Sequence, residues 1–457
     1  MLEALLGIAL LLSTALSLFL VTLPSRYIAQ KNVKETSKQT RPKTSVQVVV
    51  LGDIGRSPRM EYHALSIAKN GGLVDLIGVL DSDVHPQILQ EPLINIVPIS
   101  QSPSFLQTNN TLLVLFFAPL KALWQAFSLY YVLGYKCEPA QWMLLQNPPF
   151  IPTFTIASFV AFVRGSRLVL DWHNFGYSLF ALKFGPSHPF VRLHRWYEFK
   201  GPKSAYAHFT VTNVMAKYLQ SEADITAHPL HDRPPMHFQP LSPEQKAGFL
   251  SKFDITSKIA IGKSSNTRIL VSSTSWTPDE DFSILLDALV AYSSRAKADS
   301  SLPSIIAIIT GKGPQKEHYL SKIAELKKTD KLNRVEIHTA WLSIEDYALL
   351  LGSADLGVSL HMSSSGLDLP MKVVDMFGTG LPVVGWSDFE AWSELVQEGV
   401  NGKGFQDAQG LEKLLVGLFS DDGRQLEKLK AGAMKECDRR WDNEWNSVAG
   451  RVFGVVD

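Results

Sequence analysis

The sequence predicts an α/β protein with two Rossmann-like domains facing a cleft, preceded by an N-terminal transmembrane helix. Three observations lead to this prediction. An uncharged apolar run lies near the N-terminus, and apolar strands then alternate with helices in two separate series. A segment rich in Pro and His separates the two series, which is typical of a connection between domains. Such alternation predicts parallel sheets with helices on both faces.

Length and composition limit the possible functions. The 457 residues are too many for one core and fit two domains plus an extension. Lys and Arg number 44, as do Asp and Glu, so no net positive field attracts nucleic acid and we expect no such partner. Cys137 and Cys437 are too few and too far apart for a disulfide framework or a zinc site. We therefore expect a reducing compartment and no metal site.

Residues 1–25 are predicted to form a membrane anchor. The uncharged run from Ala4 to Leu23 is long enough for a helix that crosses the hydrocarbon core. A cleaved signal peptide is the alternative, but the run exceeds a typical signal core and no small-residue cleavage site follows it. Only Glu3 precedes the run, whereas six basic residues follow within the linker at 26–45. This asymmetry places the body of the protein in the cytosol.

The same topology makes a prediction for a glycosylation sequon. Asn109-Asn110-Thr111 matches the acceptor pattern N-x-T. Because the body is expected never to enter the lumen, we expect Asn109 to carry no glycan.

The first domain is expected at residues 46–226. SVQVVVLGDIGRSPRMEYHA is interpreted as an apolar strand, a glycine-containing loop and a helix that begins near Pro58. The loop lies where open α/β sheets bind ligands, so Gly52, Gly55 and Arg56 are placed in or beside the cleft, although the glycines also suit a simple turn. G-D-I-G lacks the full G-x-G-x-x-G fingerprint, which disfavours a dinucleotide enzyme.

The apolar segment at residues 111–134 is predicted to be a helix with two possible environments. Pro119 and Lys121 interrupt it near the middle, which argues against a second membrane span. It is either a buried helix of the first domain or a helix in the membrane interface, where amphipathic aromatic residues settle. Its aromatic residues of this kind are Trp124, Tyr130 and Tyr131.

The stretch RLVLDWHNFGYSLF ends a buried strand with polar residues. Trp172, His173 and Asn174 are therefore expected in a loop at the carboxyl edge of the sheet, where functional residues concentrate. A single His is often structural. Its position and its polar neighbours favour a functional role here, and an unperturbed imidazole titrates near neutrality.

A second α/β domain is expected at residues 264–435, after an interdomain linker at 227–263. Its first loops suit a nucleoside diphosphate, because hydroxyl groups and helix N-terminal amides hold phosphate oxygens. These loops contain Ser273 and Thr274 after the first strand and Gly311 and Gly313 in the GKGP turn after the next. The last residues, 436–457, are predicted to form a helix that packs back on the body.

The stretch SSSGLDLPMKVVDMFG brings further polar groups to the same sheet edge. The amides around Ser364, Ser365 and Gly366 are placed to receive a diphosphate. Lys372 stands in the first turn of the following helix, where the helix dipole disfavours a cation, which suggests that a bound anion compensates its charge. Asp375, one turn further on, is placed to accept hydrogen bonds from sugar or ribose hydroxyls.

Two Rossmann-like domains facing one cleft form the GT-B arrangement, and four stretches carry a more specific resemblance. GDIGRSPRMEYHA, DWHNFGYSL, SSTSWTPDEDFSILLDAL and SSSGLDLPMKVVDMFG resemble the eukaryotic chitobiosyldiphosphodolichol β-mannosyltransferases of the endoplasmic reticulum, over nearly the whole chain. The resemblance implies transfer of mannose from GDP-mannose to GlcNAc2-diphosphodolichol on the cytosolic face, in a β-1,4 linkage and without a tightly bound cofactor. It also implies the endoplasmic reticulum membrane, the chain itself and other cytosolic-face mannosyltransferases of the pathway as partners.

One departure from the wider GT-B pattern bears on stereochemistry. Many retaining relatives carry two glutamates, E-x7-E, before a G-x-P-V-V strand. Here Asp375 takes the second position and Asp368 is the acid nearest the first. The departure favours inversion, which a β-mannoside from an α-linked donor requires. ELVQEGVNGKGF resembles the turn after the donor strand in related transferases, which makes Glu394 a further donor-binding candidate, with a surface acid as the alternative.

The expected mechanism is a single displacement, in which a base takes the proton of the attacking acceptor hydroxyl. His173 is the favoured base, and Asp53 and Glu61 are its rivals. Lys372 and the amides of the serine turn are expected to stabilise the departing GDP. Two other functions stay open: another cytosolic-face glycosyltransferase of the dolichol pathway, and a membrane-anchored GT-B scaffold that performs no chemistry.

Overall fold

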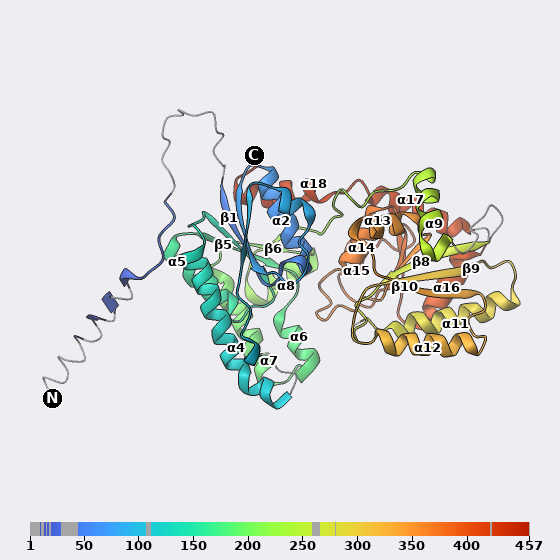
Figure 1. The fold of residues 1–457 in the computed structure, drawn as a ribbon, viewed down its shortest axis with the longest axis horizontal. Coiled ribbons are helices and arrows are strands. Elements are labelled where there is room, and N and C mark those ends of the chain that lie inside the picture. The colour runs from blue at the N-terminus through green and yellow to red at the C-terminus, as the bar shows by residue number, and fades with distance from the viewer. Residues whose placement is uncertain are drawn as a thin grey trace. The chain divides into compact units, whose positions relative to one another are not determined.

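The computed structural model describes residues 10, 13–14, 16–17, 20–28, 44–106, 111–257, 266–278, 280–420 and 423–456. The chain divides into two compact units (Figure 1). Unit 1 comprises residues 1–210, 218–228 and 445–457, and unit 2 comprises residues 211–217 and 229–444. The segment expected to link the domains, 227–263, thus belongs mostly to unit 2, and the C-terminal segment 436–457 is divided between the units.

Unit 1 is built on a parallel sheet. Among the described residues its strand order is β3-β2-β1-β4-β5-β6-β7. The strands are β1 (Ser45–Asp53), β2 (Leu73–Val79), β3 (Ile94–Pro98), β4 (Trp142–Asn147), β5 (Arg167–Trp172), β6 (Ala207–Thr210) and β7 (His228–Pro229). This is the doubly wound order 3-2-1-4-5-6 with one added strand, and ligands of such sheets bind at the carboxyl ends near the switch between β1 and β4.

Helices flank the strands of unit 1 (Figure 1). They are α2 (Pro58–Lys69), α3 (Pro86–Gln90), α4 (Thr111–Tyr131), α5 (Thr153–Arg164), α6 (Gly176–Phe184), α7 (Pro189–Lys200), α8 (Asn213–Ala223), whose first residues belong to unit 2, and the short helices α18 (Trp441–Trp445), of which only Trp445 belongs to unit 1, and α19 (Arg451–Phe453). Pro58 begins α2, since its fixed φ suits a first helical position. Val48 and Val49 of β1 have no exposed surface, as expected for a strand covered on both faces.

Helix α4 combines a buried side with an exposed apolar side. Leu129 and the following Leu133 have no exposed surface, whereas Leu123 is 66% and Phe127 is 64% exposed. The structure therefore shows that this helix is partly buried in the domain, and the alternative of a helix in the membrane interface stays a prediction. Asn109, the predicted unglycosylated residue, lies outside the described residues.

Most of the predicted anchor also lies outside the described residues. Within the part of the chain that the structure describes, no helix has the length and apolar character needed to cross a membrane. The residues just after the predicted anchor form hydrogen bonds with α5 of the same unit. Arg164, at the end of α5, donates a hydrogen bond from Nε to the Ser25 carbonyl (3.0 Å), and the Tyr27 amide donates to the Arg164 carbonyl (2.7 Å).

Unit 2 repeats the doubly wound order. Its described strands pair in parallel in the order β10-β9-β8-β11-β12-β13. They are β8 (Thr267–Ser273), β9 (Ser304–Thr310), β10 (Val335–Ala340), β11 (Leu356–Ser359), β12 (Val383–Trp386) and β13 (Gly402–Phe405). The switch between β8 and β11 makes the loops after these two strands the expected place for a ligand.

The helices of unit 2 bury one core on each face of this sheet. They are α9 (Pro243–Lys252), α10 (Asp254–Ser257), α11 (Phe282–Ala298), α12 (Lys316–Lys328), α13 (Ile344–Ser353), α14 (Met371–Gly378), α15 (Trp392–Leu395), α16 (Ala408–Phe419) and α17 (Arg424–Glu436). One core joins β8 and β9 to α11, α12 and α16, and the other joins them to α13 and α14. Side chains cap several helices: Asp281 accepts from the Ser283 amide at α11, and Asp407 accepts from the Gly410 amide at α16.

Candidate functional site

A fully buried carboxylate lies at the end of β5. Asp171 accepts two hydrogen bonds from the Arg59 guanidinium of α2, at 2.8 and 2.9 Å. Nε2 of His173 lies 2.7 Å from Asp171 Oδ2, and Nε2 of His63 lies 3.2 Å from the same oxygen. Burial alone would raise the pKa of Asp171, but Arg59 and His173 outweigh it and hold the pKa well below its usual range. Asp171 is therefore ionised.

The favoured base, His173, is oriented by this carboxylate. Its side chain is 22% exposed, so the ring reaches solvent while one nitrogen contacts Asp171. A carboxylate that accepts a hydrogen bond from an imidazole holds the ring in one orientation and stabilises the imidazolium that forms when the ring takes a proton. The geometry fits a general base.

The neighbours of His173 have packing roles. Trp172 has no exposed surface and donates its indole N–H to His208 Nδ1 (3.2 Å), and burial lowers the pKa of His208 to about 4. Asn174 accepts from the Phe175 amide (2.7 Å) at the start of α6. Trp172, expected in the loop, is thus the buried last residue of β5, whereas Asn174 lies in the loop that carries His173.

The two rival bases differ in environment. Asp53 accepts from the backbone amides of Asp81 and Ser82, at 3.1 and 3.2 Å, and hydrogen bonds from this loop lower its pKa although burial acts in the opposite direction. Burial raises the pKa of Glu61 to about 7, against a hydrogen bond from the His85 amide. Glu61 is only 4% exposed, which leaves little surface for contact with a substrate.

A pocket of 730 Å³ opens beside the end of β1, and both Gly52 and Asp53 line it. Gln101, in the loop after β3, and Lys121 of α4 also contribute polar groups to its wall. The remaining predicted residues of this loop lie elsewhere: the Arg56 side chain is 79% exposed and donates to Ser82 Oγ (3.1 Å). Gly55 is required by packing, because a Cβ there would stand 2.3 Å from the Asp83 carbonyl oxygen.

In unit 2, hydroxyl groups gather where β8 and β9 end. Ser273 Oγ lies 2.8 Å from the Tyr347 hydroxyl and 3.1 Å from Thr310 Oγ1. The Thr274 hydroxyl donates to the buried carboxylate of Glu280 (2.9 Å). Ser273 and Thr274 are thus fixed by hydrogen bonds to neighbouring strands and to the following loop.

The GKGP turn packs directly on the loop after β8. A Cβ on Gly311 would lie 1.9 Å from the Thr274 carbonyl oxygen, and one on Gly313 would lie 1.7 Å from that of Ser275. Gly311 also has φ +122°, which other residues rarely adopt. The glycines are therefore needed for the close approach of the two loops that the sequence placed at one sheet edge.

Lys372 reaches the same loop from α14. Its ammonium forms an ion pair with Glu280 and lies 3.3 Å from Ser275 Oγ. The predicted cation is thus at the carboxyl end of β8, and its side chain is 29% exposed. Glu280, which the sequence did not single out, is its partner.

The serine turn after β11 folds onto Asp368. Ser363 and Ser365 both donate their hydroxyls to Asp368 Oδ1, and His361 Nε2 lies 3.2 Å from Oδ2. Burial alone would raise the pKa of Asp368, but His361 and Ser363 outweigh it and lower the pKa. The Gly366 amide donates to Ser363 Oγ (2.8 Å), so this predicted phosphate donor is engaged within the turn.

The two remaining donor candidates lie in different surroundings. Asp375, on α14, has a pKa raised well above its usual range by burial and by the nearby carboxylate of Asp232. Glu394 accepts from the backbone amides of Asn213 and Val214, both at 2.7 Å, at the start of α8. The Glu394 carboxylate therefore occupies the position of a helix cap.

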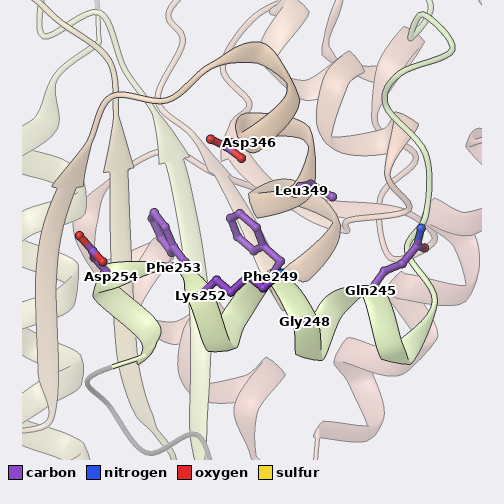
Figure 2. Close-up of a pocket in the computed structure, with 8 residues that line it drawn as sticks. All are labelled: Gln245, Gly248, Phe249, Lys252, Phe253, Asp254, Asp346 and Leu349. Carbon is purple, nitrogen blue, oxygen red and sulfur yellow. The ribbon is translucent and has the colours of Figure 1, made fainter.

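A separate pocket of unit 2 contains none of the predicted residues. Figure 2 shows Phe249, Phe253 and Lys252 on one wall of this pocket and Asp346 opposite, and the volume is 560 Å³. Its position beside α9 and α13 differs from the loops after β8 and β11.

Within the described ranges, no group of three or more His, Cys, Asp or Glu side chains is arranged to hold a metal ion.

Several residues of these networks were missed in the sequence, among them Asp171, Arg59, His63 and Glu280. Asp171 carried a signal, because a charge at the end of a strand with four buried neighbours requires a partner. Arg59 and Glu280 carried none, since each looks like an ordinary charged residue near a helix start until the fold brings it beside its partner.

Comparisons with known proteins agree with this architecture. A family model described as "Glycosyl transferases group 1" matches residues 266–421. Sucrose-phosphate synthase from Thermosynechococcus elongatus shares the fold with a TM-score of 0.62, at 12% identity, over 90% of this chain and 98% of that chain. The two doubly wound sheets thus form a GT-B glycosyltransferase fold.

Two curated relatives match at much higher identity. The UDP-glycosyltransferase TURAN of Arabidopsis thaliana is 40% identical over 90% of this chain and 97% of its own. The chitobiosyldiphosphodolichol beta-mannosyltransferase of Arthroderma benhamiae is 48% identical over 444 residues, which cover 96% of each chain. Because nearly half of the residues are shared over almost the full length of both proteins, the chain belongs to the family of chitobiosyldiphosphodolichol beta-mannosyltransferases.

Proposed function

We propose that this chain transfers mannose from GDP-mannose to the chitobiose of GlcNAc2-diphosphodolichol, in a β-1,4 linkage and with inversion. The observation that carries the proposal is the 48% identity to a chitobiosyldiphosphodolichol beta-mannosyltransferase over 96% of both chains. The hydrogen bond between His173 and Asp171 supports the mechanism, because it provides an oriented base in the unit expected to bind the acceptor.

The proposed reaction is one displacement at the anomeric carbon. His173 takes the proton of the attacking sugar hydroxyl while that oxygen bonds to the anomeric carbon. The bond from this carbon to the phosphate oxygen breaks, and GDP leaves with the electron pair. Asp171 stabilises the imidazolium that results, and solvent later removes the proton.

Unit 2 supplies the contacts to the donor in this proposal. Lys372 stands at the carboxyl end of β8, where diphosphates bind in doubly wound sheets, and its charge opposes the charge that develops on GDP. The Ser273 and Thr274 loop and the GKGP turn surround the same position. The diphosphate then competes with Glu280 for the ammonium group.

The acceptor is a lipid, and the proposal includes a membrane location. Residues 4–23 form a single membrane-spanning anchor in the endoplasmic reticulum membrane, with the body on the cytosolic side. The exposed apolar face of α4 rests in the interface and brings the pocket lined by Asp53 and Gln101 near the sugars of the acceptor. Carboxylate and amide groups of this kind suit sugar hydroxyls.

The proposal is tested with the detergent-purified full chain. Labelled GDP-mannose and GlcNAc2-diphosphate-phytanyl are incubated with the protein, and the product is digested with α- or β-mannosidase. We expect one mannose to be added and to be released by β-mannosidase alone. Release by α-mannosidase contradicts inversion, and absence of transfer by the folded protein favours the scaffold alternative.

One observation favours a second candidate donor. The relative from Arabidopsis thaliana is named a UDP-glycosyltransferase, at 40% identity. The same assay with UDP-glucose and UDP-GlcNAc in place of GDP-mannose separates the two. Transfer from a UDP-sugar at a higher kcat/KM than from GDP-mannose would replace the proposed donor.

A further inference from the structure

We propose that Trp445 and His63 are positioning residues of the transfer reaction, which fix the proton of neutral His173 on Nε2 and leave Nδ1 as the proton acceptor. This inference rests on the proposed function, because it states how the base of that reaction is prepared. It assigns a catalytic purpose to the C-terminal end of the chain, within unit 1.

The chain of contacts begins at Trp445. An indole N–H can only donate, and Trp445 Nε1 lies 2.9 Å from Nδ1 of His63. His63 Nδ1 must therefore accept, which requires a neutral ring with its proton on Nε2. Burial of the ring also lowers the pKa of His63, against the influence of Asp171.

The protonated Nε2 of His63 faces Asp171 Oδ2 at 3.2 Å. The charged and titratable groups around this carboxylate are Arg59 and His63 of α2 and His173 after β5. With three donor groups directed at it, Asp171 stays ionised and can only accept a hydrogen bond. The nitrogen of His173 that faces it must then carry a proton, and the lone pair of the neutral ring is on Nδ1.

A change at His63 would alter this arrangement. If His63 became an imidazolium, its Nδ1–H would oppose the N–H of Trp445, and a second full cation would stand beside Asp171. The attraction of Asp171 for His173 would weaken in consequence. Trp445 prevents this by offering a donor where a charged His63 would need an acceptor.

Packing holds the chain of contacts rigid. His63 and Trp445 have no exposed surface, and the His63 ring stacks on Phe209 with centroids 6.1 Å apart. The indole stacks on Phe453, also at 6.1 Å between centroids. Neither ring is free to turn, so the hydrogen-bond pattern is set by the fold and not by the substrate.

The first test compares Trp445→Phe with Phe453→Leu in the full chain. Trp445→Phe keeps an aromatic ring but removes the N–H, whereas Phe453→Leu disturbs the same cluster and keeps the N–H. We expect Trp445→Phe to lower kcat by roughly tenfold, to leave KM for the donor unchanged and to shift the midpoint of the acid limb of the pH profile. Phe453→Leu is expected to leave that midpoint in place. Equal midpoints in both variants and the wild type overturn the proposal.

A second set of variants asks whether Trp445 acts through His63. His63→Gln offers both a hydrogen-bond acceptor and a donor and should retain most of the wild-type kcat. His63→Leu offers neither, and should lower kcat to the same degree as Trp445→Phe. In a His63→Leu background, Trp445→Phe should have no further effect on kcat. Additive losses would show that Trp445 acts by another route and would overturn the assignment.

A third measurement needs neither substrate nor variant. Nitrogen NMR shifts of histidine-labelled wild-type protein report which ring nitrogen carries the proton. We expect His63 to stay neutral with the proton on Nε2 between about pH 5 and 8, and the neutral form of His173 to carry it on Nε2. The opposite tautomer of either ring overturns this proposal even if transfer occurs, whereas the expected tautomers without any transfer count against the proposed function alone.

Discussion

Single residues of this protein carry charges that the fold brings together from distant parts of the sequence. Asp171 and Arg59 are 112 positions apart, and Lys372 and Glu280 are 92 apart. The sequence singled out neither Asp171 nor Arg59, and it singled out Lys372 without its partner Glu280. The functional expectation for His173 and Lys372 followed from strand ends and helix starts, but their partners depend on which helix lies over which strand end.

Replacement of His173 by Ala tests the base directly. We expect kcat to fall by about 10²–10⁴-fold with little change in KM for the donor, because a general base acts only in the transition state. The steady-state rate and the melting temperature are measured together. His318→Ala, an exposed His of α12, serves as the control and should leave both values at those of the wild type. Near wild-type turnover in folded His173→Ala would transfer the role to Glu61 or Asp53.

Lys372 is tested by Lys372→Ala and Lys372→Arg. Loss of the ammonium should reduce kcat/KM for the donor by about 10²–10³-fold, whereas Arg should restore part of it, because a cation near the departing diphosphate stabilises the developing charge. Lys328→Ala, at an exposed position of α12, is the matched control. Equal donor kinetics for Lys372→Ala and the control contradict the phosphate role.

At the scale of elements, both sheets are parallel, as strand and helix alternation predicted, but the strand orders and the contacts between loops were not readable in the sequence. The GKGP turn was expected at the same edge as the loop after β8. That their backbones touch follows only from the twist and register of β8 and β9. The same holds for Glu394 of α15, whose sequence context indicated a donor residue and whose carboxylate accepts hydrogen bonds from backbone amides at the start of α8.

Gly313→Ala tests the contact between these two loops. The added Cβ would overlap the Ser275 carbonyl oxygen, so we expect a loss of about 1–3 kcal/mol in the free energy of unfolding and a raised KM for the donor. Gly417→Ala in α16 is the control, since no atom lies within 4 Å of the new Cβ. It should be neutral or stabilising. If both variants keep the wild-type melting temperature and KM, the loops are not held by this contact.

The cluster around Glu394 predicts a pH-dependent stability. Burial would raise the pKa of Glu394, but hydrogen bonds from His231 and Asn213 outweigh it and lower the pKa to about 2 from an ordinary 4.5. Glu394 and Glu444 raise the pKa of His231 above its ordinary 6.5. The contribution of Glu394 to the free energy of unfolding is thus present above pH 4.5 and is lost as the pH falls toward 2. The contribution of His231 is present below pH 6.5 and is lost as the pH rises through the raised pKa.

Glu394→Gln should therefore lower the melting temperature most between about pH 5 and 6.5, by an amount that corresponds to about 1–3 kcal/mol, and less on either side. Thermal unfolding of the variant and the wild type is followed across this range. Glu398→Gln, in the segment that follows the helix carrying Glu394, is the control. A difference from the wild type that does not vary with pH contradicts the charged pairing of Glu394 and His231.

At the scale of the whole molecule, the sequence predicted the number of domains, the GT-B fold and the family, because alternating strands and helices and a few long motifs determine these features. It predicted that residues 436–457 pack back on the body, but not that residues 445–457 join the N-terminal unit, since no local pattern marks Trp445 as a partner of His63. The membrane anchor remains a prediction, which rests on the uncharged run from Ala4 to Leu23.

Removal of residues 1–21 tests the anchor in the proposed reaction. This deletion keeps Ser25 and Tyr27, which contact Arg164, so the body should remain folded. We expect activity on a lipid-linked acceptor in vesicles to fall on the order of 10²-fold, because the anchor raises the effective concentration of the enzyme at the membrane. Activity on a detergent-dispersed short-chain acceptor should be unchanged. An unrelated membrane-spanning helix in place of residues 1–21 should restore activity on the acceptor in vesicles. Full activity in vesicles after the deletion contradicts the proposed role of the anchor.

The discontinuous make-up of unit 1 has a consequence for synthesis on the ribosome. Its sheet is complete at β6 and β7, yet Phe453, whose ring meets Trp142 and Phe209, is synthesised only after the residues of unit 2. At the usual rate of elongation, the nascent first unit waits roughly ten to fifty seconds for these residues, with apolar surface uncovered in the meantime. Chaperones that shield this surface during that interval are therefore expected to determine the yield of folded enzyme.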